Sequence, residues 1–235
     1  MKIEAVLFDL YGTLVDITVD EASGQLWRAI ADYLEPLGGT RNPEELKHDY
    51  LAAIILAKRQ GSRDVFERAV AIMLEGIDYD QGRFYALFRR SSRVTLSLRS
   101  FVVDLLMELR RREIKIALVS NTETVLTAVD FEDIDFPANL FDATLYSSEI
   151  GTEKPDRGIY IQALRQLGVT ADRALYIGDN ITNDILGSSA LGLRSIWIAN
   201  ENLTFNLALP SLCIGRVDEG GKGILPLIDR ADAVA

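Results

Sequence analysis

The chain has 235 residues, of which 48% are hydrophobic, and its 25 basic and 35 acidic residues give a formal net charge of −10. This length and apolar content suffice for one large domain or two. The negative charge argues against nucleic acid or an anionic membrane as the main partner, but it leaves room for a local basic pocket that binds a small anion. The single cysteine, Cys213, cannot form an intrachain disulfide, and no apolar stretch is long enough to span a membrane. Because no signal-like segment opens the chain either, we expect a soluble, cytoplasmic protein.

The first element that the sequence predicts is a buried strand over residues 4–8. Its near-continuous apolar run is typical of a parallel strand that is covered on both faces. The run ends at Asp9, and Gly12 then allows the backbone to turn away. In an α/β sheet, ligands bind at the carboxyl ends of the strands, where a carboxylate can act as a nucleophile or a metal ligand.

From about residue 18 to about residue 93, apolar residues recur at helical spacing in four groups, which are separated by glycines at 38–39, 61 and 76–82. We interpret this segment as four helices with no strands, inserted after the first strand as a domain over 17–96. Trp27 is expected in its core. His48, which lies among charged residues, is expected on the surface.

After residue 98 the pattern alternates between helices and strands. We predict strands over 115–119, 143–146, 174–177 and 195–198, helices over 101–112 and 157–167, and a short strand and a closing helix over 212–214 and 224–228. Gly168 is a helix stop signal. Alternation of this kind predicts an α/β fold, a doubly wound parallel sheet with right-handed crossovers, formed by residues 1–16 and 97–235.

Four polar motifs follow the predicted strands: Phe-Asp-Leu-Tyr-Gly-Thr at 8–13, Val-Ser-Asn-Thr at 119–122, Glu-Lys-Pro-Asp at 153–156, and Tyr-Ile-Gly-Asp-Asn at 176–180 with Asn-Asp at 183–184. Each motif alone is common in turns, helix caps or solvated loops. All four in this order, each in its strand context, resemble the haloacid dehalogenase-like hydrolase superfamily, in the subclass with a helical cap after the first strand. This resemblance extends over nearly the whole chain and implies a Rossmann-like core.

The resemblance implies a role for each motif. Asp9 is the nucleophile that forms a covalent aspartyl intermediate, and Thr13 supplies a hydroxyl that supports its loop. The hydroxyl of Ser120 and the backbone amide of Asn121 hold a phosphoryl oxygen or a substrate carboxylate. Lys154 neutralises charge on the nucleophile and the transferred group.

The resemblance also implies a Mg²⁺ site. Its ligands are the carboxylates of Asp9 and Asp179 and the backbone carbonyl of Tyr11, with Asp184 as a further or water-mediated ligand. The helical cap carries specificity for a small-molecule substrate and closes over Asp9 as a lid.

Two of the motifs favour different members of this superfamily. Tyr11 stands where the phosphatases carry a second aspartate as general acid and base, and a phenol with an ordinary pKa of about 10 is a poor base at neutral pH. This loop instead resembles that of 2-haloacid dehalogenases, whose leaving halide needs no proton. Asp179 and Asp184 favour the phosphatases, because clustered carboxylates repel without a cation and phosphoryl transfer needs one.

The sequence therefore predicts a Mg²⁺-dependent phosphatase that acts on a small phosphorylated metabolite. One alternative is a metal-independent 2-haloacid dehalogenase. Another is a catalytically weak protein that binds metal and phosphate. The oligomeric state stays open.

Overall fold

The computed structural model describes residues 2–39, 41–199, 211–218 and 220–233. The chain divides into two compact units, an α/β unit of residues 1–16, 97–121 and 137–235 and a helical unit of residues 17–96 and 122–136. Residues 122–136 therefore group with the helices, whereas the sequence analysis places them in the α/β domain. The chain passes between the units at four points, instead of the two that the sequence analysis predicts.

The α/β unit is built on a six-stranded sheet in which every neighbouring pair of strands is parallel, in the order β5-β4-β1-β6-β7-β8. The strands are β1 (Ala5–Phe8), β4 (Lys115–Ser120), β5 (Ala143–Tyr146), β6 (Ala174–Gly178), β7 (Arg194–Ile198) and β8 (Cys213–Val217). Every residue of β1 and β6 is buried, which explains their continuous apolar sequences. The predicted parallel α/β fold is confirmed.

The order of the strands places the start of the chain in the middle of this sheet. From β1 the chain adds β4 and β5 on one side and then crosses over to add β6, β7 and β8 on the other. Such a reversal opens a crevice at the carboxyl ends of the central strands, where α/β proteins bind ligands. The residues that follow β1, β4 and β6 lie at the carboxyl ends of these central strands.

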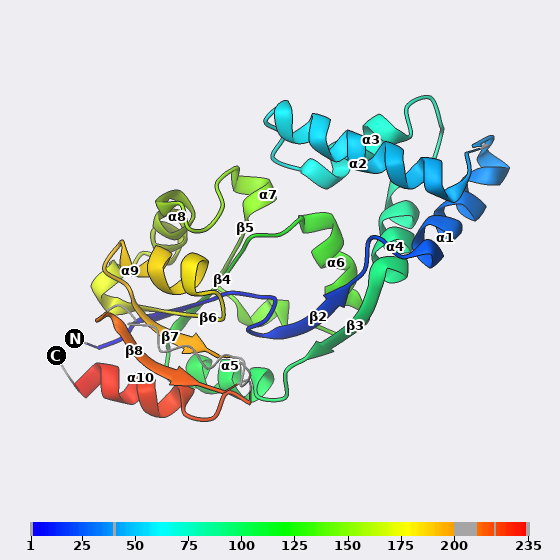
Figure 1. The fold of residues 1–235 in the computed structure, drawn as a ribbon. Coiled ribbons are helices and arrows are strands. Elements are labelled where there is room, and N and C mark those ends of the chain that lie inside the picture. The colour runs from blue at the N-terminus through cyan, green and yellow to red at the C-terminus, as the bar shows by residue number, and fades with distance from the viewer. Residues whose placement is uncertain (1, 40, 200–210, 219, 234–235) are drawn as a thin grey trace. The chain divides into compact units, whose positions relative to one another are not determined.

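Helices cover both faces of the sheet, with α8 and α9 on one face and α5 and α10 on the other (Figure 1). These helices are α5 (Val102–Arg111), α8 (Arg157–Leu167), α9 (Gly187–Ser189) and α10 (Ile224–Ala233). The N-terminus of α8 is capped by the Asp156 side chain, and α8 ends at Gly168 with φ +65°. Its buried residues Ile159, Tyr160 and Ala163 pack on alternate residues of the strands. The predicted bounds of α8 are confirmed.

Two short helices of the α/β unit were not expected from the sequence as separate elements. A four-residue helix, α7 (Ser147–Ile150), lies between β5 and Lys154, where the sequence analysis predicts only a polar loop. The helix predicted after β6 begins as one wide turn of π-helix over Ile181–Leu186 and continues as α9.

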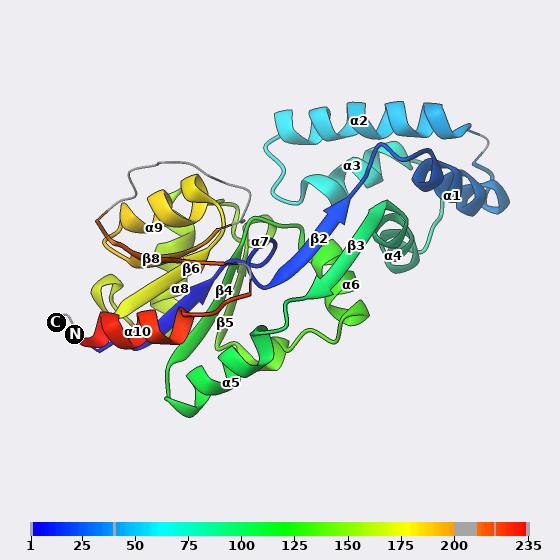
Figure 2. The ribbon, with the colours of Figure 1, turned by 60° about the horizontal axis from the view of Figure 1, so that its bottom comes forward.

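The helical unit contains the four predicted helices, α1 (Gly24–Leu34), α2 (Pro43–Arg59), α3 (Val65–Met73) and α4 (Gln81–Ser92) (Figure 2). Its core is aromatic, because Trp27, Tyr50, Phe66 and Phe88 form a chain of ring contacts. Trp27 is 1% exposed, as the sequence analysis expects. The side chain of His48 is 85% exposed, so its placement on the surface is also confirmed.

A fifth helix, α6 (Thr124–Asp133), joins this unit although its sequence has little amphipathic character. Its buried face includes Thr127 and Asp130, and the carboxylate of Asp130 accepts hydrogen bonds from Arg89 at 2.5–3.0 Å and from Arg93 at 2.9 Å. Ion pairs as well as apolar packing therefore hold α6 against α4, so hydrophobic periodicity could not reveal it.

Two strands flank the helical segment, so the expectation that it contains no strands is wrong at its ends. β2 (Val15–Val19) and β3 (Arg93–Leu98) form a two-stranded sheet, and two of the boundaries between the units fall inside them. Both strands are largely exposed and lack an apolar run, which is why the sequence pattern did not indicate them. No helix in the described part of the chain is long and apolar enough to cross a membrane.

Candidate active site

Asp9 follows β1 directly, and its side chain is held at both oxygens. Its backbone N–H donates to the carbonyl of Ile177 at 2.9 Å, which continues the pairing of β1 with β6. Oδ1 accepts a hydrogen bond from Lys154 Nζ at 2.5 Å, and Oδ2 accepts one from Thr13 Oγ1 at 3.3 Å. The residue is 6% exposed. These contacts fix the orientation of a buried carboxylate at the carboxyl end of a central strand.

Two glycines make room for the other carboxylates of the site. Gly12 has φ +85°, and a Cβ there would lie 2.3 Å from Oδ2 of Asp179. A Cβ on Gly178 would lie 2.4 Å from Oδ2 of Asp184. The sequence predicts the turn at Gly12, but only the structure shows that both positions must lack a side chain so that the acidic groups can approach the backbone.

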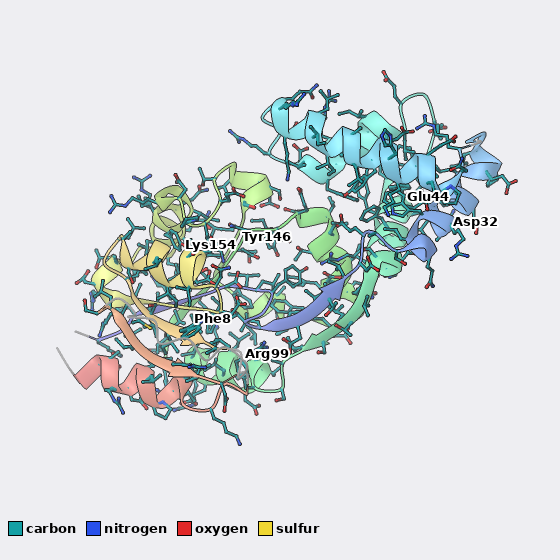
Figure 3. All side chains as sticks on the ribbon, viewed as in Figure 1. Phe8, Asp32, Glu44, Arg99, Tyr146 and Lys154 are labelled. Carbon is teal, nitrogen blue, oxygen red and sulfur yellow. The ribbon has the colours of Figure 1, made fainter. Side chains whose placement is uncertain are left out.

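Lys154, which Figure 3 labels, precedes α8 and is a buried cation, 4% exposed. Its ammonium group donates to Asp9 Oδ1 at 2.5 Å, to Asp184 Oδ1 at 2.8 Å and to the hydroxyl of Tyr176 at 3.1 Å. An ammonium group has three protons, so these three acceptors satisfy it completely. Burial opposes the charge on Lys154, but the carboxylates of Asp9 and Asp184 outweigh this effect and raise the pKa of Lys154.

Asn121 fixes the backbone of the lysine loop. Its side-chain amide donates to the carbonyl of Lys154 at 2.8 Å and accepts from the N–H of Lys154 at 2.7 Å. This role of the side chain was not predicted from the sequence, because the resemblance implies a role only for the backbone amide of Asn121. The preceding residue, Ser120, ends β4 and is 2% exposed.

Tyr176 is a site residue that the sequence analysis missed. It lies inside β6, completely buried, and its hydroxyl donates to the carbonyl of Val119 at 3.1 Å while it accepts from Lys154. Burial, followed by the charges of Asp184 and Asp9, raises its pKa, so it stays a neutral phenol. The available signal was a residue with a polar hydroxyl in a strand that is otherwise apolar.

The three aspartates of the first and last motifs converge. One carboxylate oxygen from each of Asp9, Asp179 and Asp184 lies within 4.8 Å of the others. Asp184 is fully buried, and its second oxygen accepts a hydrogen bond from the N–H of Asn180 at 2.8 Å. The carbonyl of Asp179 accepts a hydrogen bond from Trp197 Nε1 at 2.8 Å. Neighbouring strands thus position the loop that carries Asp179.

This cluster contains more acidic groups than basic ones. Burial and the charges of Asp9 and Asp184 raise the pKa of Asp179 to about 7, and burial and Asp9 raise the pKa of Asp184 to about 6. Lys154 opposes both shifts without cancelling them. Three carboxylates around one ammonium group carry an excess of negative charge, and their hard oxygen atoms are the donors that Mg²⁺ prefers. The residues present therefore fit a divalent cation.

The structure brings six of the predicted site residues into one network: Asp9, Thr13, Asn121, Lys154, Asp179 and Asp184. Ser120 lies at the end of β4, the strand that pairs with β1. Tyr11 lies in the loop after Asp9, where it forms an isolated bridge with Val15. The use of the Tyr11 carbonyl as a metal ligand remains a prediction.

Comparison with known proteins places this site in a family. The family model of haloacid dehalogenase-like hydrolases matches residues 3–192. Glyceraldehyde 3-phosphate phosphatase of Methanothermobacter thermautotrophicus is 26% identical over 209 residues, which cover 85% of this chain and 87% of the relative.

Solved structures of both enzyme types share the fold. A phosphatase from Thermococcus onnurineus has a TM-score of 0.64 at 19% identity, covering 96% of this chain and 98% of its own. A 2-haloacid dehalogenase from Pseudomonas syringae pv. Tomato DC3000 has a TM-score of 0.66 at 22% identity, covering 97% and 99%. At these identities the structural likeness indicates the fold and does not separate the two activities. The match over residues 3–192, together with the four motifs assembled at one sheet edge, shows that this chain belongs to the haloacid dehalogenase-like hydrolases.

Proposed function

We propose that this protein is a Mg²⁺-dependent phosphatase that hydrolyses a small phosphorylated metabolite. The observation that carries the proposal is the excess negative charge of Asp9, Asp179 and Asp184 around Lys154. Buried carboxylates at this spacing repel one another, and a divalent cation among them removes the repulsion. Phosphoryl transfer requires such a cation between the nucleophile and the phosphate, whereas displacement of a halide does not.

Asp9 is the nucleophile in this proposal. One of its carboxylate oxygens attacks phosphorus, an acyl phosphate forms, and the bond from phosphorus to the leaving alcohol breaks. Water then attacks the acyl phosphate, which releases inorganic phosphate and regenerates the carboxylate. Because Thr13 and Lys154 hold the two oxygens of Asp9, the carboxylate needs little reorientation before attack.

The other residues bind the phosphoryl group and the metal. Lys154 neutralises the charge of the phosphoryl oxygens, and the hydroxyl of Ser120 with the backbone amide of Asn121 binds one of them. Asp9, Asp179, Asp184 and the carbonyl of Tyr11 would hold Mg²⁺, which would supply further charge neutralisation. The helical unit serves as a cap that selects the substrate.

The relative from Methanothermobacter thermautotrophicus supports a small phosphorylated substrate, since its name specifies glyceraldehyde 3-phosphate. At 26% identity this support extends to the class of substrate and not to the individual metabolite. The chain covers 87% of that relative, so the comparison includes most of both proteins.

The test is hydrolysis of para-nitrophenyl phosphate by the purified protein with Mg²⁺ and with excess chelator, with Asp9→Asn as the control. We expect turnover that requires both the metal and Asp9. Turnover that persists in Asp9→Asn or in chelator would contradict the proposal.

Tyr11 predicts an unusual dependence on the leaving group. A phenol does not provide the general acid that an alkoxide requires, so aryl phosphates should be hydrolysed faster than alkyl phosphates. Tyr11→Asp should raise the rate on alkyl phosphates selectively, by roughly 10²-fold if the acid alone is missing. Equal wild-type rates on both ester types would show that another group protonates the leaving oxygen.

The second candidate is a 2-haloacid dehalogenase, and Tyr11 is the observation that favours it. Its test is halide release from short 2-halo carboxylates in the presence of chelator. Halide release without phosphatase activity would replace the proposal. Binding of Mg²⁺ and a phosphate analogue, with neither reaction, would instead indicate the catalytically weak alternative.

A further inference from the structure

Trp197 lies on β7 beside the loop that carries two of the three clustered aspartates. β7 is next to β6 in the sheet (Figure 1), and Trp197 pairs in register with Gly178, the residue before Asp179. The side chain of Trp197 is almost completely buried, and its indole N–H donates to the backbone carbonyl of Asp179 at 2.8 Å. A side chain from a buried strand therefore holds the backbone of the loop at Asp179 itself.

The peptide bond between Asp179 and Asn180 connects Trp197 to a second aspartate. Its carbonyl accepts from Trp197, and its N–H, which belongs to Asn180, donates to Asp184 Oδ2 at 2.8 Å. A trans peptide bond is planar, so its C=O and N–H point in opposite directions and rotate together. Trp197 and Asp184 thus hold opposite edges of one plane, and a rotation of this plane would break both hydrogen bonds. Fixing the plane also fixes ψ of Asp179, and with it the direction in which the Asp179 side chain leaves the backbone.

The indole ring is itself fixed by its neighbours. The guanidinium group of Arg216, which pairs with Trp197 from β8, lies 4.9 Å from the centroid of the ring, within the range of a cation–π interaction. Ile185 and Ala199 are buried and belong to the same apolar cluster as Trp197. Ile185 directly follows Asp184 in the chain. The ring therefore has a defined orientation and packs with the segment that carries the second aspartate.

We propose that Trp197 is a positioning residue for the metal site. Its indole N–H fixes the peptide plane between Asp179 and Asn180, and this plane holds the carboxylates of Asp179 and Asp184 in the arrangement that binds Mg²⁺. The inference rests on the Mg²⁺ site of the proposed function. Trp197 acts through the backbone rather than on the metal, as outer hydrogen-bond partners of metal ligands do, and such partners commonly contribute about 10- to 100-fold to metal affinity.

Trp27 provides a matched comparison, because the chain contains two tryptophans. Trp27 is also almost completely buried, and its indole N–H also donates to a backbone carbonyl at 2.8 Å, that of Glu21. Trp27 belongs to the helical unit, whereas the three clustered aspartates belong to the α/β unit. The two tryptophans therefore make the same kind of hydrogen bond, and only Trp197 makes it to a residue of the acidic cluster.

The first experiment compares Trp197→Phe with Trp27→Phe by isothermal titration calorimetry with Mg²⁺ alone. Phenylalanine keeps an aromatic ring at each position and removes the N–H. Trp197→Phe should raise the dissociation constant of Mg²⁺ about tenfold, because the loop peptide is then free to rotate. Trp27→Phe should change it less than about twofold, because no metal ligand loses a partner. The thermal midpoints of both variants in chelator should fall by similar amounts, since each leaves one backbone carbonyl without its indole donor.

The second experiment titrates Mg²⁺ into the wild-type chain, so it does not depend on the folding of Trp197→Phe. A ¹H–¹⁵N spectrum should contain one indole N–H resonance for each of the two tryptophans, and Trp27→Phe assigns them by removing one. Mg²⁺ should shift the resonance of Trp197 and leave that of Trp27 in place, because the cation changes the electric field at the Asp179 carbonyl, to which only Trp197 donates. The shift should saturate with the dissociation constant that calorimetry gives.

Three results would overturn the inference and leave the proposed metal site intact. Trp197→Phe that binds Mg²⁺ as tightly as the wild type would show that the indole bond contributes only to stability. Equal losses of affinity in Trp197→Phe and Trp27→Phe would indicate general loosening. Mg²⁺ that binds without moving the Trp197 resonance would show that the peptide plane is not coupled to the metal. A wild-type protein that binds no Mg²⁺ by either method would instead overturn the proposed metal site, and the role of Trp197 with it.

Discussion

Two clusters of charge, one in each unit and each containing a fully buried carboxylate, differ in how their charges are balanced. In the α/β unit, Asp9, Asp179 and Asp184 lie around one ammonium group, that of Lys154. In the helical unit, three arginines of the α4–β3 segment meet three acidic residues of α6. These ion pairs are Arg89 and Arg93 with Asp130, Arg90 and Arg93 with Asp133, and Arg90 with Glu132.

The pKa shifts follow this difference. Burial and neighbouring carboxylates raise the pKa of Asp179 and of Asp184, whereas hydrogen bonds from Arg90 and Arg93 lower the pKa of Asp133. Asp130 and Asp184 are both fully buried, so burial alone does not distinguish a structural carboxylate from a functional one. The comparison teaches that the uncompensated charge of a cluster, rather than its burial, marks a site for a ligand.

The largest effect that we expect is the loss of activity in Asp9→Asn. The neutral amide cannot attack phosphorus, so kcat should fall by about 10⁴-fold or more. The thermal midpoint of unfolding should change little, because the variant also removes one of three mutually repelling charges. Steady-state kinetics measures the fall in kcat, and calorimetry measures the thermal midpoint. If Asp9→Asn unfolds the protein as well as inactivating it, this interpretation of the cluster is wrong.

Asp130→Asn should give the opposite result. It removes the carboxylate that pairs with Arg89, itself 8% exposed, so the free energy of unfolding should fall by about 3–5 kcal/mol. The control is Glu132→Gln, whose side chain is 74% exposed and pairs with Arg90, and it should cost less than about 1 kcal/mol. Urea denaturation measures both, and equal effects would show that the buried ion pairs do not hold α6.

The affinity for Mg²⁺ should depend on pH through Asp179. With a pKa of about 7 in the metal-free protein, this carboxyl group is mostly protonated at pH 6 and mostly ionised at pH 8. The metal must displace that proton, so binding should weaken about tenfold from pH 8 to pH 6. Isothermal titration calorimetry at both values checks the prediction, and an affinity that does not change would place the metal away from Asp179.

The same shift predicts how the stability of the metal-free protein depends on pH. The pKa of Asp179 is higher in the folded state than its ordinary value of 3.8, so the folded state binds more protons between these values. The contribution of Asp179 to stability is therefore present at low pH and is lost as the pH rises through about 7. Asp179→Asn should remove this component, which chelator-treated samples can show by thermal unfolding from pH 5 to pH 8.

The smallest effect concerns Tyr176. Tyr176→Phe removes the hydroxyl that accepts from Lys154 Nζ and donates to Val119, so the ammonium group loses one of its three fixed acceptors. We expect kcat to fall about fivefold with little change in KM, because the proposed mechanism has Lys154 act on the transferred group. Tyr160→Phe is the control, since its hydroxyl donates to the carbonyl of Asn183 and not to Lys154. Equal losses in both variants would indicate general loosening instead of a role for Tyr176 in positioning.

Much of the fold could be predicted because its strands and most helices carry strong local signals. The apolar run of β1, the stop at Gly168 and the helical spacing of α1 to α4 each depend on neighbours in sequence. The elements that were missed lack such signals. α6 depends in part on Arg89 and Arg93, which precede it by about 40 residues, and β2 and β3 depend on each other across the whole helical segment.

The sequence by itself determined the α/β class, the helical insertion and most of the residues of the candidate site, because three of the four motifs directly follow strands that their own apolar patterns reveal. Only the tertiary structure decided that Tyr176 and Asn121 position Lys154 and that residues 122–136 belong to the helical unit. It also decided that Gly12 and Gly178 must lack a side chain to leave space for two carboxylates. These features are contacts between segments far apart in the chain. Hydrophobic periodicity reports which face of an element is buried, whereas the identity of the group it meets there depends on the strand order and the packing of the folded chain.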